Sequence, residues 1–171
     1  TVPSCKEVHC YTIPLGEKKE RLRLYTAFAT DVPGFSDTRM SYENAMIALR
    51  SRFQPNKGTE YLLSLLSRIT DENSVSTQDN GITQSVTVKQ GISLATKETV
   101  RPIVKLKPYR TFQEVDQPES EFIIKVYDGG EIGFYEADGG MWKLTARNTI
   151  KTYLKNCLSD LEKKGLIVIS L

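Results

Sequence analysis

The chain has 171 residues, of which 39% are hydrophobic and 26% charged, values that are ordinary for a folded globular domain. This composition excludes collagen-like, mucin-like and wholly disordered chains, and 23 basic against 21 acidic residues exclude a histone-like polycation. No apolar run approaches the about 18 residues that cross a bilayer, and we expect no signal peptide. Three cysteines argue against a disulfide framework and fit a reducing compartment. The length favours one domain.

The N-terminal segment contains two prolines over residues 1–16 and has no helical periodicity, which predicts an extended arm. We place this arm at residues 1–19 and a globular domain at 20–171. From Glu20 to Thr30, apolar and basic residues alternate with the period of a half-buried strand. Its predicted inward residues are Leu22, Leu24 and Phe28, and its predicted outward residues are Arg21 and Arg23.

Two amphipathic helices follow. The first is expected over Tyr42 to Phe53 with Ser41 as its N-cap, and the second ends at Ile69 with Thr59 as its N-cap. The polar residues 71–81 predict a mobile surface loop. Short aliphatic runs then predict strands at 86–88, 92–94, 103–106 and 122–126, and an Asp-Gly-Gly turn at 128–130 leads into a hairpin partner at 132–134.

A third helix is predicted from Ala146 to Lys164, with Cys157 on its apolar stripe and Gly165 as its left-handed C-cap. Leu166 to Leu171 is predicted to be a final strand. This order of elements indicates an α+β fold: a single domain with a mostly antiparallel twisted sheet, two to three amphipathic helices packed on it, and the extended N-terminal arm.

Residue types that carry chemistry are present but poorly arranged. Cys5, His9 and Cys10 form a zinc-like ligand set without a nearby fourth ligand, so we predict no metal site. His9 and Cys10 are adjacent and would point to opposite faces of an extended arm, which disfavours a nucleophile–base pair. A carboxylate cluster is explained better by turn chemistry, since two members begin Asp-Gly-Gly turns: Asp128, Glu131, Glu136 and Asp138. We predict no catalytic residue and no cofactor, and therefore no enzyme.

The charge pattern suggests a binding face instead. Five basic residues lie within fourteen positions that contain one acid: Lys97, Arg101, Lys105, Lys107 and Arg110. In a strand, Lys105 and Lys107 would share the exposed face, with Val104 and Leu106 inward. A second basic group comprises Lys18, Lys19, Arg21 and Arg23. These cations could attach to an anionic membrane, track nucleic-acid phosphates beside Tyr109 or Phe112, or form a solvated face paired with the acidic segment 114–121.

The layout resembles the matrix proteins of rhabdoviruses over most of residues 20–170. The resemblance rests on the order of elements and on short strings: a turn ending in Gly34-Phe-Ser-Asp37, a Leu-rich second helix, Phe122-Ile-Ile-Lys-Val-Tyr-Asp128, and a late helix followed by Gly165-Leu-Ile-Val. The chain has neither the Lys-rich start nor the Pro-Pro-x-Tyr motif of the animal members, and the loop after its second helix is polar. These departures suit the plant-infecting, cytorhabdovirus-like branch, which matures on internal membranes.

The resemblance implies a non-enzymatic structural protein of the virion and host cytoplasm, peripheral on the inner face of the envelope. It would self-associate head to tail into oligomers or filaments, bridge and condense the nucleocapsid, and contribute to budding. Its self-association arm would be Val8, Tyr11, Ile13 and Pro14. The cations implied to contact the membrane or nucleocapsid are Lys97, Arg101, Lys105, Lys107, Arg110, Lys18 and Lys19. The alternative is a small monomeric viral or phage interaction or anti-defence module that binds a host protein or nucleic acid.

Overall fold

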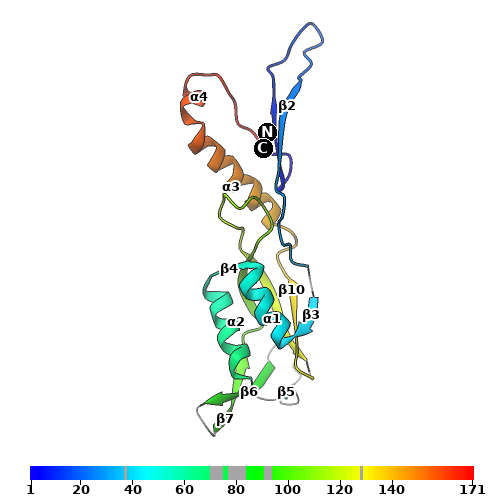
Figure 1. Ribbon diagram of the computed structural model, residues 1–171, viewed down its shortest axis with the longest axis vertical. Coiled ribbons are helices and arrows are strands. Elements are labelled where there is room, and N and C mark those ends of the chain that lie inside the picture. The colour runs from blue at the N-terminus through cyan, green and yellow to red at the C-terminus, as the bar shows by residue number, and fades with distance from the viewer. Residues whose placement is uncertain (37, 70–74, 77–83, 91–93, 128) are drawn as a thin grey trace. The chain divides into compact units, whose positions relative to one another are not determined.

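The structure is a computed structural model that describes residues 1–36, 38–69, 75–76, 84–90, 94–127 and 129–171 (Figure 1). The predicted α+β class with antiparallel strands is confirmed. The chain forms two compact units. Unit 1 consists of residues 1–33, 109–118 and 141–171, and unit 2 of residues 34–108 and 119–140. The predicted arm boundary at residue 19 lies within unit 1, and no observation tests it as a domain boundary.

Unit 2 is built on a five-stranded antiparallel sheet with the strand order β3-β10-β9-β8-β4. The strands are β3 (Thr38–Ser41), β10 (Glu131–Glu136), β9 (Ser120–Tyr127), β8 (Ile103–Pro108) and β4 (Phe53–Gln54). A second sheet in this unit contains β5 (Val75–Ser76), β6 (Gln84–Gln90) and β7 (Leu94–Val100). The predicted strands at 103–106, 122–126 and 132–134 are confirmed. Most of the predicted loop at 71–81, and Ile92 of the strand expected at 92–94, lie outside the described residues.

The two predicted helices of unit 2 are α1 (Tyr42–Ser51) and α2 (Lys57–Arg68). Ser41 caps α1 as predicted, because its Oγ accepts a hydrogen bond from the Asn44 amide. The predicted cap of α2 is wrong: Asn56 is the N-cap, and Thr59 occupies the third helical position. Each side chain bonds the other's backbone amide, at 2.9 Å and 2.8 Å, so the two residues form a reciprocal capping box.

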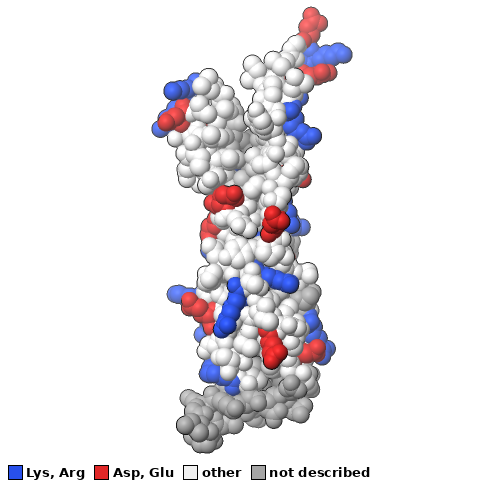
Figure 2. All heavy atoms as spheres, viewed as in Figure 1, with Lys and Arg blue, Asp and Glu red and all other residues white. Residues whose placement is uncertain are grey.

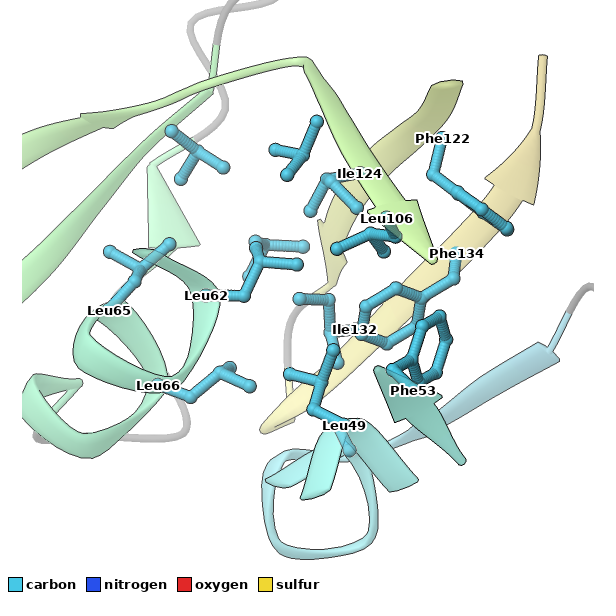
Figure 3. Close-up of a cluster of buried hydrophobic side chains, with 14 of the residues drawn as sticks. Leu49, Phe53, Leu62, Leu65, Leu66, Leu106, Phe122, Ile124, Ile132 and Phe134 are labelled. Carbon is cyan, nitrogen blue, oxygen red and sulfur yellow. The ribbon is translucent and has the colours of Figure 1, made fainter. Parts of the chain in front are cut away.

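The helices cover one face of the sheet and leave the other face open. Alternate residues of β9 point inward, and the leucines of α1 and α2 meet them (Figure 3). Phe53, Phe122 and Phe134 all pack edge-on around Phe35. The buried core of this unit is Ala45, Leu49, Phe53, Leu62, Leu65, Leu66, Val86, Val100, Val104, Leu106, Phe122, Ile124, Val126, Ile132 and Phe134.

The Asp-Gly-Gly segments behave as turns. Gly129 and Gly130 have φ values of 83° and 77°, a left-handed conformation that favours glycine, and they connect β9 to β10. Asp128 itself lies outside the described residues. At the second turn, the Asp138 carboxylate accepts hydrogen bonds from the Gly140 amide at 2.9 Å and the Ser120 hydroxyl at 2.5 Å. The turn interpretation of Asp138 is therefore confirmed.

Unit 1 contains the hairpin of β1 (Glu7–Tyr11) and β2 (Arg23–Phe28), together with α3 (Trp142–Cys157) and α4 (Ser159–Lys163). Its buried core is small and consists of Val2, Val115 and Ile150, with Val8, Phe112 and Leu154 packed against it. The predicted third helix begins earlier than Ala146 and is interrupted at Leu158, because Ser159 and Asp160 favour a new helix start over continuation. Gly165 has φ 69° and ends α4, as predicted.

Two further predictions for the C-terminal part are wrong. Leu166 to Leu171 forms no strand, although the Val2 amide donates to the Ser170 carbonyl at 3.0 Å. Strand pairing needs a neighbouring edge in register, which an aliphatic sequence does not by itself provide. Cys157 was expected on the buried stripe but is exposed, since the helix buries only Ala146 and Ile150. A hydrogen bond with Cys157 raises the pKa of Tyr153.

Candidate interaction surfaces

The β1–β2 hairpin of unit 1 has an exposed apolar face. Strand β2 is confirmed, but its predicted burial is wrong: Leu24 is 53% exposed, Phe28 59% and Leu22 60%. Tyr11 and the hairpin residues Ile13 and Leu15 are also exposed. Among the described strands β2 pairs with β1 alone, and no described helix covers Leu24 and Phe28. We use the name hairpin face for five of the exposed apolar side chains of this hairpin, Tyr11, Ile13, Leu22, Leu24 and Phe28.

The beginning of the predicted arm is held by its own chain. The N-terminal ammonium donates to the His9 carbonyl at 2.8 Å, and the Thr111 hydroxyl donates to the Cys5 carbonyl. Val8 packs against the core of unit 1. Of the four predicted arm residues, Val8 therefore packs within its own chain, whereas Tyr11, Ile13 and Pro14 are exposed.

The end of the hairpin carries charges of both signs. Lys18, Lys19, Arg21 and Arg23 are exposed, as predicted, and Glu17 and Glu20 lie among them. Lys19 has φ 51° and, with Gly16, forms the turn. Figure 2 shows blue and red side chains at this end of the hairpin and mostly uncharged surface along it. The hairpin thus combines an apolar face with a charged, mostly basic tip.

The residues of the predicted basic segment lie in different surroundings. Lys105 and Lys107 lie on the outer face of β8, with Val104 and Leu106 buried, as predicted. Arg110 belongs to unit 1 and is only 5% exposed, with its guanidinium 4.3 Å from the Trp142 ring centroid. Its prediction as a contact residue is not supported, because Pro108 ends the strand and the chain leaves the sheet there.

The two remaining residues of that segment lie outside β8. Arg101 is exposed and its guanidinium lies 4.5 Å from the Tyr61 ring centroid. The backbone of Lys97 lies in β7, opposite Thr87, and its side chain is outside the described part of the chain. The exposed basic residues of the segment that face outward from the five-stranded sheet are therefore Lys105 and the partly exposed Lys107.

The outer face of the five-stranded sheet also carries an aromatic and cationic cluster. The Arg39 guanidinium lies 4.1 Å from the centroid of the Tyr127 ring, and the Lys125 Nζ lies 5.2 Å from it. Arg39 Nε donates to the Glu131 carboxylate at 2.5 Å. The Tyr127 and Tyr135 hydroxyls hydrogen-bond to each other at 2.7 Å, and this bond raises the pKa of Tyr135. We name Arg39, Lys125, Tyr127 and Tyr135 the tyrosine cluster.

A glycine makes this cluster possible. Gly133 lies on β10 between Lys125 of β9 and Arg39 of β3. A Cβ atom at Gly133 would lie 2.6 Å from the Tyr135 ring, so a side chain at position 133 would displace that ring. The absence of a side chain lets the end of the Tyr135 ring lie against the strand backbone. The sequence-based site predictions contain none of these residues. The signal that could have identified them is a glycine inside an alternating strand with tyrosines on the same face.

The expected metal ligands are dispersed. Cys5 lies partly buried near the start of the chain, and Cys10 points to the opposite side of β1 from His9. The imidazole of His9 contacts the Tyr11 hydroxyl at 3.0 Å and the Glu7 carboxylate at 3.4 Å. Within the described ranges, no group of three His, Cys, Asp or Glu side chains gathers as metal ligands would.

No family model, curated protein or solved structure matches the chain. Among the described residues, no helix has both the length and the apolar character that crossing a membrane would require. The candidate surfaces therefore rest on their own geometry: the hairpin face of unit 1, and the outer sheet face of unit 2.

Proposed function

We propose that this chain is a non-enzymatic structural protein of the matrix type, which self-associates and attaches peripherally to anionic surfaces during the assembly of a virion. The observation that carries this proposal is the hairpin face. Five large apolar side chains of one hairpin are exposed, in a unit whose hydrophobic core cluster has three buried members. Exposed apolar groups in such a contiguous set are typical of protein or membrane contacts.

The hairpin has little stability of its own. Two-stranded hairpins are at best marginally stable in water, because one strand pair buries too little apolar surface. Covering a Leu or Phe side chain that is now half exposed contributes about 1 kcal/mol or more. Association through the hairpin face would therefore stabilise the hairpin and the assembly together.

The proposed occupant of the hairpin face is a second copy of the chain. Each copy also presents an exposed aliphatic segment after α4, in which Leu166 is 65% and Val168 87% exposed. A hairpin of one copy that docks on this segment of the next makes a head-to-tail contact, since the two surfaces differ. Such contacts extend into open chains when their rotation does not close. This is the polymerisation that a matrix layer around a nucleocapsid needs.

The basic side chains supply the second contact. Lys18, Lys19 and Arg21 lie at the hairpin tip, and Lys105 and Lys107 lie on unit 2. Each cation near an anionic leaflet contributes about 1 kcal/mol, and salt screens this attraction. A few such residues per copy give weak attachment, which self-association multiplies over many copies. We place the assembled protein on the inner face of the envelope, between membrane and nucleocapsid.

Light scattering over a range of protein concentrations, with and without phosphatidylserine vesicles, tests the proposal. The wild-type chain should form concentration-dependent oligomers, and the double variant Leu24→Ser/Phe28→Ser should shift the midpoint of assembly at least tenfold to higher concentration. The matched control is Ile47→Ser, because Ile47 is 64% exposed on α1 of unit 2, whereas the hairpin face belongs to unit 1. A wild-type chain that stays monomeric at high concentration and ignores vesicles would instead favour the monomeric interaction module.

The charge contribution has its own control. Lys18→Glu/Lys19→Glu should reduce vesicle binding and its salt dependence, whereas Arg50→Glu/Arg52→Glu, two exposed residues at the end of α1, should leave both unchanged. Equal losses in the two double variants would mean that overall charge, and not the hairpin tip, governs attachment.

A further inference from the structure

The outer face of the five-stranded sheet has an ordered pattern of rows. Ile103, Ile123 and Tyr135 lie side by side on β8, β9 and β10, because Ile103 pairs with Ile123, and Ile123 pairs with Tyr135. Ile103 is 52% and Ile123 45% exposed. These three residues form a row across the sheet, on the side that α1 and α2 do not cover, and we name them the apolar row. Ile103 and Ile123 are its aliphatic members, and the Tyr135 ring leans from the row over Gly133.

Basic side chains lie on both sides of this row. Two residues along β9 in one direction, Lys125 shares a row with Arg39, across Gly133. Two residues in the other direction, Lys105 of β8 lies opposite Glu121. The strand rise places each of these rows about 7 Å from the apolar row. A chain-like ligand lying across the sheet would meet flat apolar groups in the middle and cations on each flank.

The acidic residues on this face are few and are opposed by basic ones. Glu131 is engaged by Arg39, and Glu121 is the cross-strand partner of Lys105. Lys125 approaches the Tyr127 ring, and Lys107 follows Lys105 along β8. The described outer face therefore carries four basic side chains, Arg39, Lys105, Lys107 and Lys125, against two acidic ones.

We propose that this face is a binding platform for single-stranded nucleic acid, with bases stacking on Tyr135 and the apolar row and phosphates contacting Arg39, Lys125 and Lys105. Sheets that bind single strands combine exposed aromatic rings with a positively charged track. The tyrosine cluster places two partly exposed rings beside cations, and Arg39 over Tyr127 adds a guanidinium plane on which a base can stack. Stacking reads no base edge, so the platform binds with little sequence preference.

The tyrosines are held in place before a ligand arrives. Tyr135 lies against Gly133 and is bonded to Tyr127, which in turn is contacted by Arg39 and Lys125. Side chains that are already ordered lose little conformational freedom when a base stacks on them. This platform lies on unit 2, whereas the hairpin face lies on unit 1, so the inference does not depend on the proposed self-association.

Fluorescence anisotropy with labelled twelve-nucleotide oligouridylate and oligoadenylate tests the proposal in the full-length chain. Both oligonucleotides should bind, with an affinity that falls as salt rises. Tyr135→Leu removes the ring and should weaken binding at least tenfold, whereas Tyr135→Phe keeps the ring and should bind within about threefold of wild type. The melting temperatures of both variants show whether a loss arises from unfolding.

The contribution of the cations is tested with a matched pair of charge-reversal variants. Lys125→Glu should weaken binding at least tenfold and flatten the salt dependence, while Arg50→Glu should do neither, because Arg50 is exposed on α1, on the helical side of the sheet. On the side of unit 2 that Figure 2 shows, basic and acidic side chains are interspersed, so an equal effect of the two variants would mean diffuse electrostatics and overturn the platform.

Three other outcomes also overturn the proposal. They are no binding of either oligonucleotide at low salt, binding that survives Tyr135→Leu in the folded protein, and a dependence on Tyr135 and Lys125 seen only with phosphatidylserine vesicles or an acidic peptide. Light scattering on the same variants separates the two proposals, since Lys125→Glu and Tyr135→Leu should leave self-association unchanged and Leu24→Ser/Phe28→Ser should leave oligonucleotide binding by the monomer unchanged.

Discussion

Gly58→Ala is a substitution for which helix propensity and packing predict opposite signs. Gly58 lies in the first turn of α2, where Ala would favour the helix by about 0.5–1 kcal/mol. A Cβ atom at this position, however, would lie 2.0 Å from the Lys105 carbonyl oxygen and 2.8 Å from the Val104 side chain. The nearest obstacle is backbone, so rotamer changes cannot relieve the clash, and α2 and β8 must separate by about 1 Å or more.

Separation also strains the contact that joins these elements. The Asn56 side-chain amide donates to the same Lys105 carbonyl at 3.0 Å, and such a bond contributes about 1 kcal/mol. Overpacking typically costs about 1–3 kcal/mol. Set against the gain in propensity, the net effect is a destabilisation of about 2 kcal/mol. For a chain of this length, that lowers the melting temperature by about 4–8 °C.

Thermal and urea unfolding followed by circular dichroism measure this effect. The matched control is Ser64→Ala, an exposed position of the same helix, where we expect a change within about 0.5 kcal/mol. If Gly58→Ala is as stable as the wild type or more stable, propensity outweighs packing and the close approach of α2 to β8 is not a constraint on the fold.

Two further predictions concern unit 1. Gln117→Leu should destabilise the chain by about 2–4 kcal/mol in urea unfolding, because the buried Gln117 amide bonds backbone groups of the loop 109–118 at 2.9–3.3 Å. An effect below about 1 kcal/mol would mean that water replaces those bonds. Iodoacetamide should alkylate Cys10 and Cys157 in the native protein before Cys5, as read by peptide mass spectrometry, and protection of Cys157 would restore its predicted place on a buried stripe.

The elements predicted best from sequence are those whose signals are local. Ser41 caps α1 through its own side chain, and the alternation of 120–127 gives β9. The same local approach misplaced the cap of α2, because Asn56 and Thr59 are both good cap residues and only the geometry shows that Asn56 is the cap and Thr59 its partner. The helix and strand content was therefore largely predictable, whereas the details of its ends were not.

What sequence could not give is the identity of each element's neighbours. Lys105 and Arg110 are close in the chain and were grouped by charge, yet one is exposed on a sheet and the other stacks on Trp142 in a different unit. The tyrosine cluster shows the opposite case, in which residues far apart in the sequence come together. Arg39 and Tyr127 are far apart in sequence and meet only because β3, β10 and β9 are neighbours. A run of charged residues can be recognised in a sequence, but a cluster formed across neighbouring strands can be recognised only when the strand order is known.

The contrast between β2 and β9 bears most directly on function. Both alternate apolar and polar residues, and both are strands, but β9 lies between β8 and β10 with the leucines of two helices on its apolar side, whereas β2 has β1 alone and its Leu24 and Phe28 face solvent. An alternating pattern predicts that one face of the strand is covered, but it does not identify the element or partner that covers it. In β9 the same chain provides the cover. In β2 the described residues do not, and the proposed self-association would supply that cover. For this reason the double variant at Leu24 and Phe28 should cost little stability in the monomer, since it removes few buried contacts, and much in the assembly; a large loss of monomer stability would mean that the face is covered within the chain after all.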